Sequence, residues 1–476
     1  MVKKYLAFCF LLFSIPTLLK AQQYGLFNTR TLFDGFENPA QKTFVLDSSR
    51  KFASNFLLPY FGLNAANKGN NDLIRKAINE GTYNAGNLPL RTGAINTVHE
   101  NTNIYLLTFR IFQSYKWQKE LGFSWQLRSD GHVDYTNETL AILDSYKRFD
   151  NSPYDDVFNN DGYAQSYHQF SMTYRENYNK RLAFGVKLSL LSGITYNKLN
   201  ISDSYLHQDF ANDLISVRVK GIYRSTFQEA DELAARNLVP TFRNPGMTLG
   251  FGTSYQAKSG VFMMANIKDL GFIKWRKKAY TNKINTQVFI ENLSQKTSNQ
   301  VANEIADIAI DEADTGSFYS ATNAKVDFML SKAFSLSAPD FTYTPSLIVS
   351  KNLFYKGGEA AFVSKFKYKD LAISAIPAYN FNNLFFMGLQ GMYQTPNFEV
   401  FLGSDNLFKT VTQANGAIKR DATIGTGYNA ASFYMGLGFK FGNTVEHPQN
   451  SSTMPGIGDE QKSFFKKLFS VFSKKR

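Results

Sequence analysis

The sequence has almost no cysteine and, after its first residues, no long apolar run. Its single cysteine, Cys9, lies in an apolar stretch at the N-terminus, so the rest of the chain must be stable without disulfides. After residue 21 no segment approaches about 18 consecutive apolar residues, and no membrane-spanning helix is expected there. The mean hydropathy of −0.28 is typical of soluble proteins. A transmembrane β-barrel can give the same value, because only every second residue faces lipid.

Residues with catalytic or metal-binding chemistry are scarce as well. None of the five histidines is paired with Cys, or with Glu and a second His, at the spacing of a metal site, and no G-x-S-x-G motif is present. We therefore expect no enzyme and no cofactor. One acidic cluster, closed by Gly162, is a weak calcium candidate, and a solvated external loop is the favoured alternative. The calcium ligands would be Asp155, Asp156, Asn159 and Asp161.

The N-terminus has the organisation of a secretory signal peptide. Lys3 and Lys4 precede the apolar stretch Tyr5–Leu19, and Ala21 offers a small residue for cleavage. Such a stretch is too short to span a bilayer as a helix. We expect residues 1–21 to be removed on export. Export also argues against nucleic acid as the partner of this basic chain, whose formal net charge is +13.

Aromatic residues are abundant, with 44 Phe and 26 Tyr, and this bias suits β-strands and membrane interfaces. Near the C-terminus a strictly alternating segment ends at residue 441. Alternation with period two indicates a strand with one apolar face and one polar or small face. The apolar face of this closing strand consists of Phe433, Met435, Leu437, Phe439 and Phe441.

The same alternation recurs along residues 43–442, and short turn signals separate many of the segments, which predicts an antiparallel meander. The expected fold class is all-β, a transmembrane antiparallel up-and-down β-barrel of about 14 strands, within a range of about 12 to 16. The alternative is a soluble sandwich or propeller, but no blade-like repeat appears. Helical insertions are expected in the external loops, at residues 72–80, 229–236 and 298–314.

Charged residues on the polar faces are mostly basic. In a barrel these faces line the lumen, although a register shift of one residue would exchange the two faces. A water-filled lumen of this charge would favour anions, whereas in a packed lumen the same charges would pair with their neighbours. The expected lumen-facing charges are Arg110, Lys187, Arg218, Lys220, Lys365, Lys367, Lys440, Asp327 and Glu399.

The segment Phe36–Ala40 reads Phe-Glu-Asn-Pro-Ala and precedes the first clear strand. Pro39 removes a backbone N–H and keeps Asn38 extended, which suits a fixed turn. An Asn-Pro-Ala element soon after a signal peptide, followed by a barrel of this size, resembles the long-chain fatty-acid transporter family of outer-membrane proteins. The resemblance implies that residues 22–42, with Asn38, Pro39 and Ala40, form a hatch inside the barrel, and that hydrophobic compounds diffuse through. An ordinary ordered turn is the alternative.

Two further segments carry a resemblance. With residues 398–408 (FEVFLGSDNLF) and the closing strand, the chain is similar to an uncharacterised Bacteroidetes-type barrel family of unknown function. This resemblance implies placement in the outer membrane of a Gram-negative bacterium and no particular activity. A final strand that ends on an aromatic also resembles the signal read by the barrel-assembly machinery, although here 35 residues follow Phe441.

The C-terminal tail divides into a polar linker, residues 443–461, and a basic segment, residues 462–476. Apolar residues recur at helical spacing in the basic segment, which predicts an amphipathic helix on an anionic lipid surface. Docking to a periplasmic partner and a disordered tail are the alternatives. The membrane-facing stripe would be Phe465, Leu468, Phe469 and Phe472, flanked by Lys466 and Lys467.

Two functions fit these expectations. The first is an integral outer-membrane barrel that forms a passage or binding site for small hydrophobic or anionic compounds. The second is a non-transporting barrel subunit that scaffolds periplasmic or outer-membrane partner proteins through its external loops and periplasmic tail. A hatch that leaves an apolar pocket would favour the first function. A plugged lumen beneath a rigid loop platform would favour the second.

Overall fold

The computed structural model describes residues 27–115, 117–227, 239–276, 279–310, 313–335, 340–445 and 463–465. The predicted signal peptide, the predicted helix at residues 229–236 and most of the predicted tail helix lie outside these residues. In the part of the chain that the structure describes, no helix is long and apolar enough to cross a membrane.

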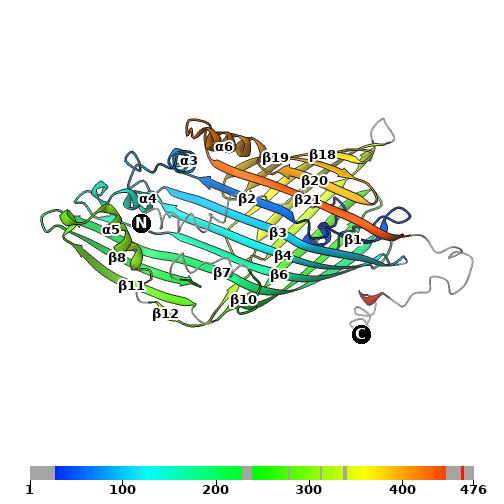
Figure 1. Cartoon of the computed structure of the whole chain (residues 1–476), viewed down its shortest axis with the longest axis horizontal. Helices are drawn as coiled ribbons and strands as arrows, with labels where there is room; N and C mark the ends of the chain where they lie inside the picture. Colours follow the sequence, from blue (N-terminus) through cyan, green and yellow to red (C-terminus); the bar gives the residue numbers. More distant parts are fainter. Residues whose placement is uncertain are drawn as a thin grey trace, which may run out of the picture.

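The strands form one closed antiparallel barrel of 14 strands, which confirms the predicted fold (Figure 1). The barrel closes because the last strand pairs with β20 on one side and with both parts of the first strand on the other. Around the wall the strands are β1 (Arg50–Ser54) continued by β2 (Tyr60–Lys68), β3 (Ile95–Ser114), β4 (Lys119–Thr136), β6 (Asp161–Asn177), β7 (Leu182–Asp209), β9 (Pro245–Gln256), β10 (Val261–Trp275), β13 (Phe318–Ala321) continued by β14 (Lys325–Lys332), β16 (Phe341–Asn352), β17 (Gly358–Tyr368), β18 (Leu371–Asn380), β19 (Leu384–Gln394), β20 (Phe398–Ser404) and β21 (Asn429–Thr444).

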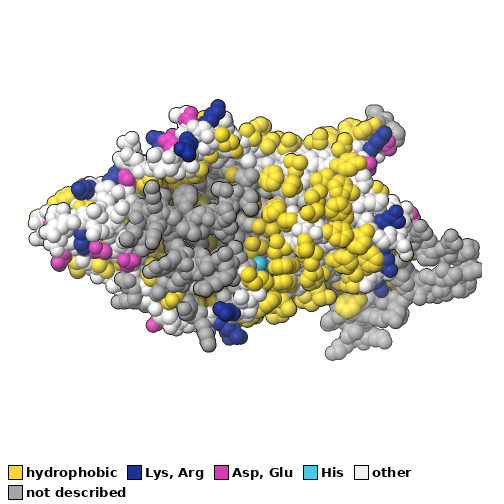
Figure 2. All heavy atoms as spheres, viewed as in Figure 1, with side chains coloured by type: hydrophobic (Ala, Val, Ile, Leu, Met, Phe, Trp, Pro, Cys, Tyr) yellow, Lys and Arg dark blue, Asp and Glu magenta, His cyan; other side chains and the backbone are white. Residues whose placement is uncertain are grey.

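The barrel wall has an apolar outer face. Met172, Leu190, Ile373 and Phe385 are between 60% and 64% exposed, and Figure 2 shows such side chains gathered in a broad belt. A belt of this kind is typical of a barrel embedded in hydrocarbon. In β21 the polar and small residues are buried on the inside. The five apolar residues of the closing strand, on the outside, are Phe433, Met435, Leu437, Phe439 and Phe441.

The two ends of the barrel differ in their connections. At one end, here called the turn end, short turns join the strands, for example at residues 178–181, 257–260 and 395–397. At the opposite end, the loop end, the connections are longer, for example residues 405–428. In bacterial outer-membrane barrels the short turns face the periplasm and the long loops face outward.

Beyond the loop end, the sheet continues into a small structure that we call the loop-end platform. The first half of β7 pairs with β9 in the wall, whereas its second half pairs with β8 (Leu214–Ser225) outside the wall. Strands β11 (Tyr280–Glu291), β12 (Asp314–Thr315) and β5 (Tyr154–Asp155) extend this sheet. One face is covered by α4 (Asn137–Asp144), the 3-10 turn Tyr146–Arg148 and α5 (Ser298–Asp307), which share an apolar core with β8 and β11.

Two further helices pack against each other at the loop end. They are α3 (Asn71–Asn79), which confirms the helix predicted at residues 72–80, and α6 (Leu407–Lys419), which was not predicted. Gln413 Nε2 of α6 donates to Asn79 Oδ1 of α3 (2.7 Å). In the third predicted insertion, α5 ends at Asp307, short of residue 314, because the chain then returns to pair with β11 as β12.

Candidate functional site

The lumen is occupied by the N-terminal segment of the described chain, residues 27–49, here called the plug. Residues 31–41 are all buried, and residues 34–37 form the short helix α2 (Asp34–Glu37). The plug runs inside the wall and then turns into β1 at the turn end (Figure 1). The predicted hatch residues Asn38, Pro39 and Ala40 therefore lie in the lumen.

Two side chains fix the local course of the plug. Asp34 accepts hydrogen bonds from the backbone N–H groups of Thr29 and Arg30 (2.8 Å each) and so holds the turn that precedes α2. After the helix, Asn38 Oδ1 accepts from Ala40 N (2.9 Å). Asp and Asn stabilise turns in this way because their short side chains can bond to nearby backbone N–H groups.

Glu37 connects the plug to the wall. Its carboxylate accepts hydrogen bonds from Asn103 Nδ2 (2.9 Å) and from the hydroxyl of Tyr105, both on β3. It also forms an ion pair with Lys268 of β10, and Arg128 of β4 lies 3.9 Å away. Glu37 and three of these partners are buried, and the side chain of Lys268 is only 13% exposed. Removing one partner from such a site leaves an uncompensated buried charge, so the arrangement holds α2 in place.

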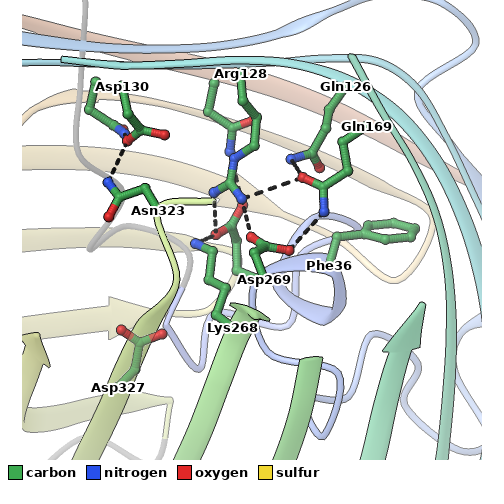
Figure 3. A network of polar contacts seen from close by, with 12 residues as sticks. Phe36, Gln126, Arg128, Asp130, Gln169, Lys268, Asp269, Asn323 and Asp327 are labelled. Atoms are coloured by element: carbon green, nitrogen blue, oxygen red, sulfur yellow. Dashed lines mark hydrogen bonds and ion pairs between the residues drawn. The ribbon is translucent and has the colours of Figure 1, made fainter. Parts of the chain in front are cut away.

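Asp269 forms the second centre of this network (Figure 3). It forms ion pairs with Arg128 and with Lys187 Nζ (3.1 Å), and it accepts from Gln169 Nε2 (2.7 Å). Lys187 in turn donates to the backbone oxygen of Phe36 in the plug (2.9 Å). Three positive wall residues, Arg128, Lys187 and Lys268, thus share two carboxylates, Glu37 of the plug and Asp269 of the wall.

A β-bulge places both Lys268 and Asp269 in the lumen. The register between β9 and β10 shifts between Ile267 and Leu270, and Asp269 has a positive φ of 53°. A bulge adds one residue to a strand and re-aims its side chains. As a result two consecutive residues face inward here, where ordinary alternation would place only one.

A second buried ion pair, between β3 and β4, also contacts α2. Arg110 Nη2 is 2.8 Å from Glu120 Oε2, and both side chains are almost fully buried. The guanidinium also lies over the ring of Phe36, 5.7 Å from its centroid. A Cβ at Gly35 would be only 1.6 Å from Arg110 Nη1, so glycine is needed for this close approach. Glu120 also accepts from the backbone N–H of Thr43 (3.1 Å).

Three of the remaining predicted lumen charges, Lys365, Lys440 and Glu399, contact the backbone of the plug. Lys440 Nζ donates to Thr43 O (2.9 Å) and Lys365 Nζ to Asn28 O (3.2 Å), while Glu399 accepts from a plug N–H. The lumen is therefore packed at this level and not filled with water. Of the two alternatives for its charges, pairing with neighbouring groups is the one observed here. The predicted charges that face inward are Arg110, Lys187, Lys365, Lys367, Lys440, Asp327 and Glu399.

Arg218 and Lys220 do not face the lumen, contrary to the prediction. Both lie on β8, which belongs to the loop-end platform and not to the barrel wall. The apolar face of β8 packs against α4 and α5, so its polar face points to the outside. Arg218 is half exposed there, 3.5 Å from Asp203.

Aromatic residues fill the lumen beside the charged network. The ring of Phe33 in the plug lies 5.1 Å from that of Tyr60, 5.4 Å from that of Tyr105 and 6.0 Å from that of Phe401. Gly436 of the closing strand makes room for this cluster, because a Cβ there would lie 2.5 Å from Phe401 and 2.8 Å from Tyr60. Gly436 is thus required by the wall aromatics that pack around Phe33.

The first wall strand is interrupted at residues 55–59, between β1 and β2. Phe56 and Leu57 have positive φ values of 48° and 64°, a rare conformation for bulky residues, and their side chains are 55% and 64% exposed. The interruption removes backbone hydrogen bonds between this strand and β3. The side chain of Asn55 replaces one of them, because its Oδ1 accepts from Thr108 N of β3 (2.8 Å). The interruption is therefore strained and apolar, and a side chain seals it.

Three of the four candidate calcium ligands already have protein partners. Asp161 Oδ2 lies 2.9 Å from Lys356 Nζ, and Asp156 Oδ1 accepts from Asn159 Nδ2 (2.6 Å). Asp155 is exposed. Among the residues that the structure describes, no group of three or more His, Cys, Asp or Glu could hold a metal ion.

Of the predicted tail helix, the structure describes only residues 463–465. The backbone N–H of Phe465 donates to Glu176 Oε1 (2.7 Å) on β6, and its ring packs 5.5 Å from that of Phe184. This contact covers a carboxylate on the outer side of the wall, and Glu176 is fully buried as a result. The other predicted interface residues, Leu468, Phe469, Phe472, Lys466 and Lys467, lie outside the described residues.

Sequence reasoning missed the centres of the lumen network. Glu37, Lys268 and Asp269 were not among the predicted charges, nor were Arg128 and Glu120. One signal was available for the bulge, because Ile267 and Leu270 are both apolar and three residues apart, which breaks the alternation of β10. Glu37 offered no such signal, because the plug has no periodic pattern.

Solved structures with a similar chain course include a channel, a transporter and a translocator domain. One is the TodX deltaS2S3 mutant monoaromatic hydrocarbon channel, with a TM-score of 0.42 and 9% identity over 85% of this chain and 92% of that chain. Another is the toluene transporter TbuX of Ralstonia pickettii, with a TM-score of 0.40 and 7% identity over 85% and 92% of the two chains. A third is the translocator domain of the autotransporter NalP from Neisseria meningitidis, with a TM-score of 0.32 and 8% identity over 83% and 90%.

Similarity this distant does not identify what the chain binds. No curated protein is similar enough to this chain to be recognised as a relative. A sequence family, in contrast, matches most of the chain, from residue 46 near the end of the plug to residue 405 just after β20. The chain therefore belongs to a family of unknown function, DUF5723.

Proposed function

We propose that the protein is an integral barrel of the outer membrane of a Gram-negative bacterium, closed by its own N-terminal segment. In this proposal it binds another protein through the loop-end platform and does not act as an open passage. The apolar belt, the predicted signal peptide and the contrast between short turns and long loops support this placement.

One observation carries the closed state: the plug is bound to the wall through buried ion pairs. Glu37 pairs with Lys268, and the backbone of the plug accepts hydrogen bonds from Lys187 and Lys440. Breaking such a pair costs about 3–5 kcal/mol. Because several contacts act on one short segment, thermal motion alone would rarely displace it.

Planar-bilayer recordings test the closed state. The wild-type protein should give no steady conductance, and a variant that lacks residues 27–49 should give open-channel currents if its barrel still forms. Heat-modifiable migration on a gel reports whether the barrel has formed. Steady wild-type currents like those of the deletion variant would contradict the proposal.

The outer face of the platform offers the binding surface. It presents Arg218 and Lys220 beside two exposed apolar side chains, Ile222 (40% exposed) and Phe289 (59% exposed). Exposed aromatic and arginine side chains are enriched where proteins bind each other. A platform whose opposite face is an apolar core can hold these groups in fixed positions.

Cross-linking in native membranes tests this surface. The variant Phe289→Ser/Ile222→Ser should lose a cross-linked species that the wild type forms. The control variant Leu371→Ser, which alters an exposed apolar residue (58% exposed) at the turn end of the wall, should keep it. Equal cross-linking by all three proteins would show that the platform is not the binding surface.

The interrupted wall strand favours a second candidate function, passage of small hydrophobic compounds. Residues 55–59 are strained and apolar, and they lie next to the buried ring of Tyr60. Strained segments of this type occur where structures must move. If this function is correct, Asn55→Ala, which removes the seal, should increase uptake of a radiolabelled hydrocarbon into cells relative to wild type. Asn151→Ala, an exposed loop variant, should not.

A further inference from the structure

Helix α6 exposes a stripe of large apolar side chains. Phe408, Val411 and Ile418 are 67%, 59% and 82% exposed. Their spacing of three and seven residues places them on one side of the helix. Scattered apolar residues on a surface need no explanation, but three on a single helix face form a patch that water solvates poorly.

The opposite side of α6 is fixed to the barrel. Thr410 Oγ1 donates to Ser432 O of β21 (3.2 Å). A Cβ at Gly416 would lie 2.3 Å from Asn79 Nδ2, so the helix is seated closely on α3. The apolar stripe therefore cannot rotate inward, and it faces away from the barrel wall.

Strand β20 is too short to cross a bilayer by itself. It has 7 residues. At about 3.3 Å per residue and a tilt of about 40°, it rises roughly 18 Å, whereas the lipid-facing band of such barrels is about 25 Å tall. Its neighbour β21 continues beyond the last β20 pair, Gly403–Tyr434, as far as Asn429. The wall therefore has a step above β20.

Helix α6 occupies this step. It begins at Leu407, three residues after the end of β20, and it lies beside the loop-end parts of β19 and β21 (Figure 1). Below it, Leu402 of β20 and Phe385 of β19 belong to the exposed belt, at 56% and 60% exposed. The stripe of α6 thus continues the belt toward the loop end.

Basic residues stand at the far end of the helix. Lys419 and Arg420 are exposed directly after Ile418. Lys409, near the start of α6, is already engaged, with its Nζ 4.7 Å from the ring centroid of Tyr428. The order along the helix is therefore apolar first and basic last, which fits a passage from acyl chains to headgroups.

We propose that α6 is an interfacial helix that binds lipid of the outer leaflet. Phe408 and Val411 lie among the acyl chains, and Lys419 and Arg420 contact anionic headgroups. The inference depends on the membrane placement proposed above. It extends the lipid-binding surface from the strands of the barrel to a loop helix that completes the wall above a short strand.

Site-directed spin labelling tests this inference, since Cys9 is the only cysteine of the chain. In a Cys9→Ser background, Phe408→Cys and Ile418→Cys are labelled with a nitroxide and reconstituted into phosphatidylcholine–phosphatidylglycerol vesicles. Leu389→Cys in the middle of β19 is the lipid reference, and Asn151→Cys in an exposed loop is the water reference. Faster relaxation of the nitroxide by oxygen shows that the label lies in lipid, and faster relaxation by a water-soluble nickel complex shows that it lies in water.

The label at residue 408 should resemble that at residue 389, and the label at residue 418 should lie between the two references. A label at residue 408 that is as accessible to nickel as residue 151 would overturn the proposal. If residue 408 were aqueous in vesicles of extracted outer-membrane lipid but protected in isolated outer membranes, the stripe would bind a protein, which would also overturn it. Unfolded samples are excluded by heat-modifiable migration on a gel.

A second variant tests the headgroup contact. Lys419→Gln/Arg420→Gln should make the label at residue 418 less sensitive to phosphatidylglycerol content, while the wild-type pair should draw the label deeper as this anionic lipid increases. The charge effect should weaken with added salt. If the label at residue 418 responded equally to phosphatidylglycerol in both proteins, the proposed contact of Lys419 and Arg420 with anionic headgroups would be wrong.

Discussion

Strands β8 and β21 carry the same alternation with period two, yet they turn their apolar faces in opposite directions. In β21 the apolar residues point outward, and the inner side meets the plug. In β8 Ile215, Val217 and Val219 point toward helices α4 and α5, and the polar side faces outward. Alternation thus predicts a strand with two unlike faces. Which medium each face meets depends on whether the strand closes a barrel or extends beyond its rim.

The two regions are also held together by different interactions. The platform has an ordinary apolar core, in which burial of methyl and methylene groups supplies most of the stability. The barrel exposes a belt of large apolar groups on its outside, and its interior combines the aromatic cluster around Phe33 with paired charges around Glu37, Asp269 and Glu120. Substitutions of the same kind should therefore have unequal effects in the two regions.

The largest effect is expected in the lumen. Glu37→Ala leaves Lys268 and Arg128 without their plug carboxylate, and the free energy of unfolding should fall by about 3–5 kcal/mol. Urea unfolding of the detergent-solubilised protein, followed by heat-modifiable migration, measures the loss. Glu37→Gln/Lys268→Met removes both charges together and should recover part of it. A stability of Glu37→Ala equal to wild type would mean that the plug is not bound as described.

The platform core should respond next. Ile215→Ala removes a fully buried side chain from β8 and should destabilise the platform by about 2–5 kcal/mol. Ile222→Ala, on the outer face of the same strand, should cost less than about 0.5 kcal/mol. Limited proteolysis of the loops measures the difference while the barrel stays intact. Equal sensitivity of the two variants would contradict the assignment of the faces of β8.

A charge on the outer faces compares the two regions directly. Leu389→Arg puts a cation on the lipid side of β19, near the middle of the wall, and should cost about 2–4 kcal/mol in a bilayer. Phe289→Arg places the same cation on the outer face of the platform, in water, and should cost less than about 0.5 kcal/mol. Unfolding in lipid vesicles gives both values. Similar costs at the two positions would mean that the belt does not end below the platform.

The smallest effect is expected at the interrupted strand. Leu57→Gly should relieve the strain of a positive φ and stabilise the barrel by up to about 1 kcal/mol. Leu58→Gly is the matched control, because the neighbouring residue is also an exposed leucine but is not among those with positive φ, so this change should only destabilise. The same unfolding measurement compares them. A loss of stability in both variants would show that the interruption is not strained.

Much of the fold could be predicted from the sequence because alternation is a local signal. The number of barrel strands and the outward face of the closing strand followed from it directly. The location of Asn38–Ala40 in the lumen followed from a family resemblance, and no periodic pattern could have supplied it. The helices α3 and α5 were predictable from their caps and stripes.

The rest depended on neighbours distant in the sequence. Arg218 and Lys220 were assigned to the lumen because β8 alternates like a wall strand, and only its pairing with the outer half of β7 removes it from the wall. Asp269 enters the lumen through a bulge that interrupts the register. The role of Glu37 depends on side chains from β3, β4 and β10 that meet only in the closed barrel.

The central claim is that the plug is part of the folded interior, and amide hydrogen exchange of the protein in lipid vesicles tests it most directly. Buried and hydrogen-bonded amides exchange only through opening of the structure. The buried, hydrogen-bonded plug amides of Leu32, Phe36, Asn38, Ala40 and Gln41 should exchange as slowly as those in the middle of β3 and β4. Exchange of these plug amides within seconds, while β3 and β4 remain protected, would contradict the account.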